Sequence, residues 1–391
     1  MAEVDKIFDG IRPYYDSEIP ASIERMKKHP YLEEIANFLK IKGGIEHLVN
    51  MLSACKTVDD FQDKIMVLVV STILEHTSNG VTHSGLHYFS GNQKHLIITN
   101  HRDIVLDSAI IQLILHTHKV TTTEIAVGDN LITSQFIEDV ARSNKMIKVT
   151  RSSSPREVYN SSMLLSKYIR HNVATQTSSI WIAQRNGRTK DGFDQTEQGL
   201  LKMLEMSGKG DFITDMDELS IMPVAISYEF EPCDALKTRE LYVSRRCRYV
   251  KEEGEDLHSI ITGIALWKGG IHIDFTEPIR TEQIASCAAF SKNERFVELG
   301  KIIDKRIHSY FKLWPNNFIA YDLLMAEENI EPEFFAEYSS QQKNAFEAHM
   351  EKQLSYIESH ACPIDGEEWN RSELREIFLN IYANPVRASL K

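Results

Sequence analysis

Apolar and polar residues follow two different spacings along this chain, and the changes of spacing divide it into three regions. Over residues 1–85, apolar positions recur every three or four residues, as in YLEEIANFLK, which is typical of amphipathic helices. Over residues 86–284, short apolar runs alternate with amphipathic segments such as SSMLLSKYIR. Over residues 285–391 the helical spacing returns, notably in FFAEYSSQQKNAFEAHMEKQLSYIESH.

Six apolar runs of the middle region are predicted to be strands, separated by amphipathic segments. This alternation predicts an α/β fold whose central sheet is mostly parallel or mixed and is flanked by helices. We expect helical extensions at 1–85 and 285–391 around an α/β core at 86–284, with the C-terminal extension packed on that core. The predicted strands are residues 95–99, 124–127, 147–151, 180–184, 222–228 and 271–275.

Composition narrows the class of protein. The formal net charge of -12 argues against general nucleic-acid binding and against attraction of the whole surface to anionic lipid, so any anion site must be local. No apolar run reaches the ~20 residues that span a bilayer. The longest, 65–74, is better explained by core packing than by a membrane-binding patch. The N-terminus lacks a signal-peptide pattern, so we expect the cytoplasm, with peripheral contact at the inner face of the membrane left open.

One histidine follows a predicted strand directly. The run at 96–98 ends in Thr99-Asn100, and His101 comes next, with Asp103 and Asp107 after it. A neutral imidazole can accept a proton from a hydroxyl if a carboxylate fixes its tautomer and stabilises the imidazolium. Either aspartate could supply that carboxylate. The alternative is a surface loop, in which Asp103 serves the first turn of a helix.

Two cationic segments also follow predicted strands. Arg151 precedes Ser154-Pro155, a good helix start, and an arginine beside a helix N-terminus can bind phosphate. The other segment, QRNGRTKDG, places three cations within six positions, which would bind phosphate or a CoA-like anion. The alternatives are a capped helix with a solvated arginine and a solvated charged loop. The second segment contains Arg185, Gly187, Arg188, Thr189 and Lys190.

The remaining candidates have simpler interpretations. IMPVAISYEFEPCD is predicted to be a core strand, or the wall of an acyl or acceptor pocket. The basic run RRCR at 245–248 is predicted to be a solvated surface. The five cysteines are scattered without a CxxC pair, which argues against a disulfide framework or a zinc site.

Taken in order, these segments resemble the glycerol-3-phosphate acyltransferase branch of the phospholipid acyltransferase superfamily. NHRDIVLD resembles its N-H-x-x-x-x-D block, and GDNL followed by IKVTR resembles its phosphate-binding arginine block. NGRTKDG followed by EQGLLKM resembles its glycine- and arginine-containing block, and PVAISYE resembles its proline-led strand. The resemblance spans residues 95–230, roughly.

Two features depart from the family pattern. Five residues rather than four separate His101 from Asp107, which would turn Asp107 by about 100° on a regular helix unless a loop or a π-bulge absorbs the extra residue. Arg185-Asn186 stands where the family has Glu-Gly, which leaves the identity of the acceptor open.

The resemblance implies acyl transfer from a thioester, acyl-CoA or acyl carrier protein, to a hydroxyl of glycerol-3-phosphate or 1-acylglycerol-3-phosphate in phospholipid biosynthesis. His101 would be the general base, oriented by Asp107, with Asp103 as the alternative. It implies no metal, no cofactor beyond the co-substrate and no nucleic acid, but peripheral contact with a membrane. The implied substrate-binding residues are Arg151, Arg185, Gly187, Arg188, Thr189 and Lys190.

Three other functions stay open. The acceptor could be another hydroxylated lyso-lipid, for example a lyso-amino-acid lipid. The chain could be a hydrolase, although the G-x-S-x-G pattern of serine hydrolases is absent from the sequence. It could also be a non-catalytic, lipid-binding relative.

Overall fold

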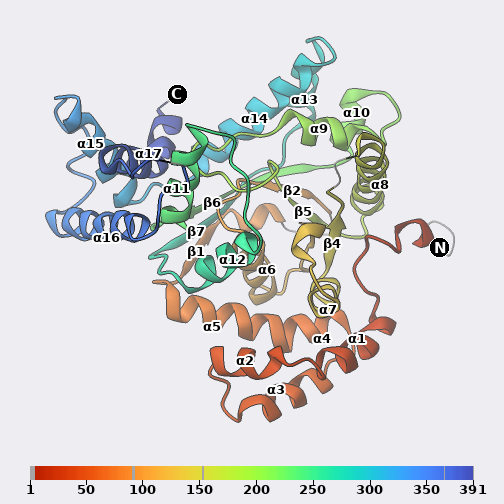
Figure 1. The fold of residues 1–391 in the computed structure, drawn as a ribbon. Coiled ribbons are helices and arrows are strands. Elements are labelled where there is room, and N and C mark those ends of the chain that lie inside the picture. The colour runs from red at the N-terminus through yellow and green to blue at the C-terminus, as the bar shows by residue number, and fades with distance from the viewer. Residues whose placement is uncertain (1–4, 90–92, 152–153, 365, 391) are drawn as a thin grey trace.

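A seven-stranded sheet forms the centre of the computed structural model, within the residues that it describes, 5–89, 93–151, 154–364 and 366–390 (Figure 1). The strands are β1 (Val81–Ser84), β2 (Leu96–Thr99), β3 (Glu124–Gly128), β4 (Met146–Val149), β5 (Ile180–Ala183), β6 (Ile221–Tyr228) and β7 (Ile271–Phe275). Their order is β1-β7-β6-β2-β5-β3-β4. All neighbours are parallel except β6 and β7, which confirms an α/β fold with a mixed sheet.

The six predicted strands are all present, each with its ends within two residues of those expected. The sequence pattern misses β1, whose residues it assigns to the helical N-terminal region. This assignment is wrong because residues 81–84 pair in parallel with β7 at the edge of the sheet. β1 has four residues and none of them is fully buried, so its pattern is too short to indicate a strand.

The central strand β2 is buried on both faces. Leu96 and Ile98 pack into the core on one face, and Ile97 packs into the core on the other, because successive side chains of a strand point in opposite directions. Burying each of these side chains contributes about 1.5–3 kcal/mol. The residues that follow β2 therefore extend from a rigid support.

Helices cover both faces of the sheet (Figure 1). On one face α8 (Pro155–Ala174), α9 (Gln198–Glu205), α10 (Phe212–Asp217), α13 (Thr281–Ala288) and α14 (Glu294–Tyr310) share one apolar core with the strands. On the other face α5 (Val67–Thr77) and α6 (Leu106–Thr117) share a second core. The site described below lies in the loops that leave this layered centre.

The N-terminal helices form a separate apolar cluster with α7 (Gln135–Ser143). The helices of this cluster are α1 (Ile19–Met26), α2 (Tyr31–Phe38), α3 (Gly44–Ser53), α4 (Val58–Phe61) and the π-helical η3 (Gln62–Met66). Two short helices precede them, η1 (Asp5–Phe8) and η2 (Asp16–Glu18), and Phe8 of η1 packs into the first core of the sheet instead. The apolar run at 65–74 crosses from η3 into α5, where Ile65, Val70, Ile73 and Leu74 are buried. The predicted core packing of this run is confirmed. Two short 3-10 helices, η4 (Leu86–Phe89) and η5 (Asp129–Leu131), lie in loops of the sheet.

The C-terminal helices α15 (Pro315–Glu327), α16 (Ser340–Glu358) and α17 (Arg371–Ser389) pack together with α11 (Asp234–Ser244). Between β6 and β7 the chain forms α11 and then α12 (Glu255–Ala265). α16 begins later than the predicted segment does. Ser339 caps it, because the Ser339 Oγ accepts the N–H of Gln342 while the Gln342 Oε1 accepts the N–H of Ser339.

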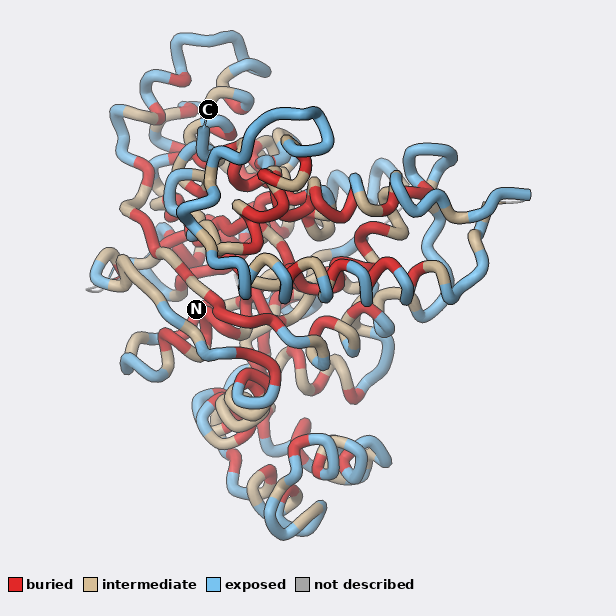
Figure 2. Tube along the Cα trace, turned by 90° about the vertical axis from the view of Figure 1, so that its left-hand side faces the viewer, coloured by how far each residue is buried: buried red, intermediate tan, exposed pale blue. Residues whose placement is uncertain are grey.

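Buried residues follow the sheet and the inner sides of the helices (Figure 2). The run at 245–248 is exposed, as predicted, and Arg246 pairs with Glu367 and Glu373. The five cysteines are free thiols, of which Cys247 is exposed. Within the described part of the chain, no helix is both long enough and apolar enough to cross a bilayer.

Candidate active site

The loop from β2 to α6 carries the candidate base. β2 ends at Thr99, His101 follows two residues later, and α6 begins at Leu106. Because β2, β5, β3 and β4 run in parallel, the loops that leave their carboxyl ends lie at one edge of the sheet. This edge is where the cationic segments after β4 and β5 emerge as well.

His101 and Asp107 form a direct pair. The His101 Nδ1 lies 2.9 Å from the Asp107 Oδ2, and the Asp107 side chain is only 1% exposed. The same oxygen accepts the backbone N–H groups of Arg102 at 2.6 Å and Asp103 at 2.9 Å. The Asp107 Oδ1 accepts the hydroxyl of Tyr228 at 2.8 Å. Four donors thus surround one buried carboxylate, which compensates for its removal from water.

The extra residue between His101 and Asp107 is absorbed in the loop, because α6 starts only at Leu106. Asp107 therefore reaches the imidazole despite the departure from the family spacing. Asp103, the alternative partner, does not pair with His101. Its Oδ1 accepts the N–H groups of Val105 at 2.9 Å and Leu106 at 2.8 Å, so it caps the start of α6.

The surroundings of Asp103 differ from those of Asp107. Burial, and then the charge of Asp107, raise the pKa of the Asp103 carboxyl. Its Oδ2 is buried without a hydrogen-bond partner among the described residues. A Cβ at Gly263 would lie 2.2 Å from this oxygen, so α12 packs closely against it. Asp103 is a structural cap rather than a partner of the base.

His101 forms part of the wall of a cleft with a volume of about 380 Å³. Its side chain is 13% exposed, and its ring lies edge-on to Trp181 with 6.1 Å between the centroids. With Nδ1–H donated to Asp107, Nε2 retains the lone pair that can accept a proton. The ring is thus oriented as a general base requires.

The cleft combines cationic and apolar walls. Arg151 and Arg185 line it together with His101. A phosphorylated molecule with an apolar portion would find complementary groups in such a cleft. The apolar walls come from β3 to β5 and from α8 and α9, and include Val127, Val149, Leu165, Ile182, Leu200 and Met203.

Arg151 lies where the chain passes from β4 to α8. Its N–H donates to the Asp129 Oδ1 at 3.0 Å, and α8 begins four residues later at Pro155 with Ser154 as its N-cap residue. A Cβ at Gly128 would lie 2.6 Å from the Arg151 Nε, so only glycine leaves room for this side chain. The segment GDNL therefore helps to position Arg151.

The other predicted binding residues are dispersed around His101. Gly187 lines the cleft. Thr189 is buried, and its N–H donates to the carbonyl oxygen of His101 at 2.7 Å. Lys190 forms an ion pair with Glu240 and does not line the cleft.

Arg188 does not line the cleft either, and it lies beside Cys233. Burial raises the pKa of the Cys233 thiol to about 11, and the charge of the neighbouring Arg188 opposes this effect. The structure therefore brings Arg151, Arg185 and Gly187 together with His101, and it places Arg188, Thr189 and Lys190 outside the cleft.

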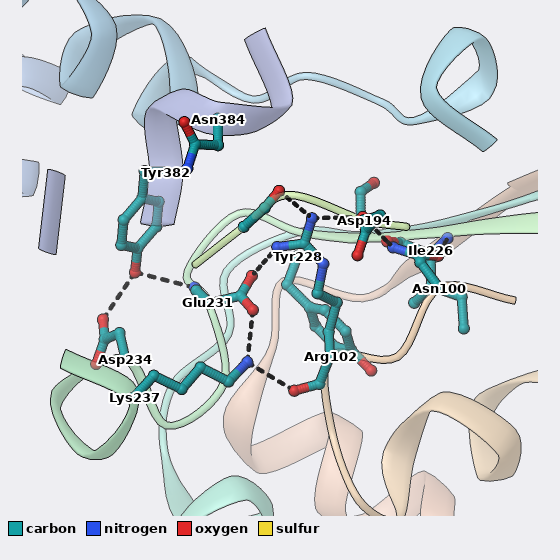
Figure 3. A network of polar contacts seen from close by, with 12 residues as sticks. Asn100, Arg102, Asp194, Ile226, Tyr228, Glu231, Asp234, Lys237, Tyr382 and Asn384 are labelled. Carbon is teal, nitrogen blue, oxygen red and sulfur yellow. Dashed lines mark hydrogen bonds and ion pairs between the residues drawn. The ribbon is translucent and has the colours of Figure 1, made fainter. Parts of the chain in front are cut away.

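A buried charge network holds the residue after His101 (Figure 3). The Arg102 guanidinium donates to the Asp194 Oδ2 at 2.6 Å and to the Glu231 Oε2 at 3.2 Å. The Lys237 Nζ donates to the Glu231 Oε1 at 2.6 Å and to the Arg102 carbonyl at 2.8 Å. The Tyr382 hydroxyl of α17 accepts the N–H of Glu231 at 2.9 Å. The C-terminal helices thus contact the network behind the candidate base.

Asn100 ties the end of β2 to β6. Its Nδ2 donates to the Ile226 carbonyl at 2.9 Å and to the Asp194 Oδ2 at 3.0 Å, and its Oδ1 accepts the Ile226 N–H at 2.8 Å. An asparagine side chain presents both a donor and an acceptor, as this position requires. The side chain of the asparagine before His101 therefore anchors the start of the loop to β6.

Sequence reasoning misses Tyr228, Asp194, Glu231 and Lys237. For Tyr228 a signal was present, because a strand that ends in a tyrosine and lies beside β2 directs that residue towards the loop after β2. The contact could be predicted only with the strand order known, because β6 lies beside β2 with Val224 opposite Thr99.

Three comparisons bear on this site. The acyltransferase family matches residues 80–227. A solved 1-acyl-sn-glycerophosphate acyltransferase from Thermotoga maritima aligns with a TM-score of 0.40 and 10% identity, over 74% of this chain and 91% of that chain. The curated proteins give no match. The segment that matches the acyltransferase family contains His101, Asp107, Arg151 and Arg185.

Proposed function

We propose that this chain, through its acyltransferase domain, transfers a fatty acyl group from an acyl thioester to a hydroxyl of a phosphorylated glycerol or lysolipid. The acceptor would be glycerol-3-phosphate or 1-acylglycerol-3-phosphate, and the donor acyl-CoA or acyl carrier protein. The proposal rests mainly on one observation, the 2.9 Å contact that orients His101 through Asp107 at the wall of the cleft.

In the proposed reaction, His101 Nε2 accepts the proton of the acceptor hydroxyl. The oxygen attacks the thioester carbonyl, and the tetrahedral intermediate collapses as the carbon–sulfur bond breaks. The imidazolium returns its proton to the departing sulfur, which leaves as a thiol. No covalent enzyme intermediate forms. A positioned general base contributes typically ~10²–10⁴-fold to the rate.

The cationic wall supports a phosphorylated acceptor. Arg151 and Arg185 would bind its phosphate, because guanidinium groups match the geometry of phosphate oxygens. Holding the phosphate at that wall would keep the hydroxyl near His101, and such orientation supplies much of the rate of a bimolecular reaction. The reaction itself requires no metal or cofactor besides the thioester. We propose a cytoplasmic location with peripheral contact at the inner face of the membrane, where a lipid product would be delivered.

The test measures acyl transfer by the full chain from palmitoyl-CoA to a panel of acceptors: glycerol-3-phosphate, lysophosphatidate, a lyso-amino-acid lipid and no acceptor. Free CoA and the acylated product are both quantified. We expect His101→Ala and Asp107→Asn to lower kcat/KM by about 10²–10⁴-fold.

His116→Ala is the matched control. His116 lies at the far end of α6, also pairs with an aspartate, Asp63, at 3.1 Å, and does not line the cleft. The activity of the His116→Ala variant should equal that of the wild type. Activity of His101→Ala near the wild-type level would overturn the catalytic assignment. Transfer only to the lyso-amino-acid lipid would show that this lipid, rather than a phosphorylated glycerol, is the acceptor. CoA release without acceptor would indicate hydrolysis.

A further inference from the structure

We infer that Tyr228 is a positioning residue that holds the Asp107 carboxylate and thereby sets the proton affinity of His101. This inference rests on the proposed function, because it concerns the base of that reaction. It extends the His101–Asp107 pair to a third member, contributed by a different strand.

The contacts of Asp107 are divided unequally between its two oxygens. Oδ2 faces three donors, the His101 ring and the backbone N–H groups of Arg102 and Asp103. For Oδ1 the donor found among the described residues is the Tyr228 hydroxyl, at 2.8 Å. Tyr228 therefore fixes the rotation of the carboxylate that keeps Oδ2 directed at the ring.

Tyr228 is itself rigidly held. It is 2% exposed and ends β6, whose eight residues are all buried. Val224 of β6 lies opposite Thr99 of β2, and Asn100 bonds to both backbone groups of Ile226. The distance from Tyr228 to the loop carrying His101 is thus set by the sheet.

The hydroxyl acts as a donor over the working pH range. Burial, followed by the charge of Asp107, raises the pKa of Tyr228 well above its ordinary value. A neutral phenol beside a carboxylate has one useful arrangement, in which O–H donates to the carboxylate oxygen. Such a bond to a charged acceptor is stronger than one between neutral groups.

Other charged groups share these surroundings and should stay constant in any test. Asp103 lies on the same loop, and Asp103 and Glu231 act on Tyr228 after Asp107 does. Arg188, after β5, acts on Asp103. Lys268 and Cys233 also interact with the charge of Asp103. Ionisable residues on the wall of the cleft that His101 lines are Arg151, Arg185 and Glu197.

The first experiment compares the pH dependence of kcat/KM for wild type and Tyr228→Phe. Without the hydroxyl, Asp107 attracts the imidazolium more strongly, so the protonated form of His101 is favoured. We expect the acid limb to move to higher pH by about one unit, so that kcat/KM measured at a pH on this limb falls about tenfold, because a bond to a charged group is lost.

Tyr168→Phe is the matched control. The Tyr168 hydroxyl also donates to a carboxylate, the Glu124 Oε2 at 2.6 Å, and Tyr168 is 5% exposed. It does not line the cleft. This variant removes a comparable buried bond, so its acid limb should coincide with that of the wild type even if its stability falls.

A second variant covers the case in which Tyr228→Phe fails to fold. Site-specific 3,5-difluorotyrosine at position 228 keeps the shape of the ring and makes the hydroxyl a stronger donor. We expect the acid limb to move to lower pH, opposite to the shift for phenylalanine.

The inference is overturned if the limb stays at the wild-type position in the difluorotyrosine protein, or if Tyr228→Phe moves it no more than Tyr168→Phe does. These outcomes are distinct from failure of the proposed function. A fully active His101→Ala variant would contradict the assignment of His101 as the base, and with it the proposed function. An inactive His101→Ala variant together with an unshifted acid limb in Tyr228→Phe would contradict only the role of Tyr228.

Discussion

The backbone N–H of Thr189 donates to the carbonyl oxygen of His101, with 2.7 Å between the two atoms. This contact joins the loop after β5 to the loop after β2. The segment NGRTKDG therefore holds the candidate base through its main chain, while Arg185 and Gly187 of the same segment line the cleft.

Replacing Thr189 by valine should leave catalysis intact. Thr189 is fully buried, and its hydroxyl has no hydrogen-bond partner among the described residues. Removing an unsatisfied buried hydroxyl relieves a desolvation penalty, so the free energy of unfolding should stay the same or rise by up to about 1 kcal/mol. Urea unfolding and the acyltransfer assay test this. A large rise in KM for the acceptor would mean that the Thr189 side chain binds substrate.

Arg151→Ala and Arg185→Ala should weaken binding of a phosphorylated acceptor. Each change removes a guanidinium from the cleft wall, and a hydrogen bond to a charged group is worth about 1.5–3 kcal/mol, or roughly 10–100-fold in KM. The KM for monoacylglycerol, an acceptor without phosphate, should change little. Lys190→Ala is the control, because Lys190 pairs with Glu240 outside the cleft. If all three variants raise KM equally, the cleft is not the phosphate site.

Asp103→Asn should alter the pH dependence of stability. The pKa of Asp103 is raised in the folded protein by burial, so the folded state binds its proton more tightly than the unfolded state does. Its contribution to stability is complete below the unfolded pKa of about 3.8 and is lost as pH rises through the folded pKa. Asparagine caps a helix as well as aspartate does but does not titrate. The variant should therefore gain stability relative to wild type as the pH rises above the unfolded pKa of Asp103, as measured by urea unfolding.

Asp211→Asn provides a control of opposite sign. Asp211 also caps a helix, through the N–H of Thr214, but bonds from Thr214 lower its pKa. Its contribution is present above the unfolded pKa and is lost as pH falls. This variant should lose stability relative to wild type as pH rises. Equal, pH-independent differences for the two variants would contradict the assignment of Asp103 as a buried cap.

Arg102→Met should destabilise the fold strongly. It leaves the buried carboxylates of Asp194 and Glu231 without their shared cation, although Lys237 still contacts Glu231. Breaking a buried pair typically costs about 3–5 kcal/mol. Arg371→Met, which removes a cation from the exposed side of α16 and α17, should cost less than about 1 kcal/mol. Similar values for the two variants would show that the buried network contributes little.

Much of the fold follows from the sequence because the interior strands are short, continuous apolar runs. β2 and β5 are buried on both faces, so their patterns are strong. β1 escapes detection because a half-exposed edge strand of four residues carries little periodic signal. The predicted helical segment begins before α16 does because aromatic residues before Ser339 continue the apolar spacing, although Ser339 caps the helix.

The site is less predictable than the fold. His101 and Arg151 stand directly at strand ends, so their positions could be inferred. The choice between Asp103 and Asp107 depends on where α6 begins, and this is set by the conformation of the loop at 100–105. The contact between Arg102 and Glu231 joins residues 129 positions apart. Such pairs depend on strand order, which local patterns do not specify.

The segment that matches the acyltransferase family ends at residue 227, one position before Tyr228. Beyond it lie Glu231 and Lys237, which neutralise and anchor Arg102. Further still is α17, against which Gly192 packs so closely that a methyl group there would meet the Ile381 carbonyl at 2.0 Å. A chimera that grafts only the homologous stretch onto another scaffold would inherit the histidine without the residues that keep it in place. The unit that can be transplanted is thus larger than the unit that homology recognises.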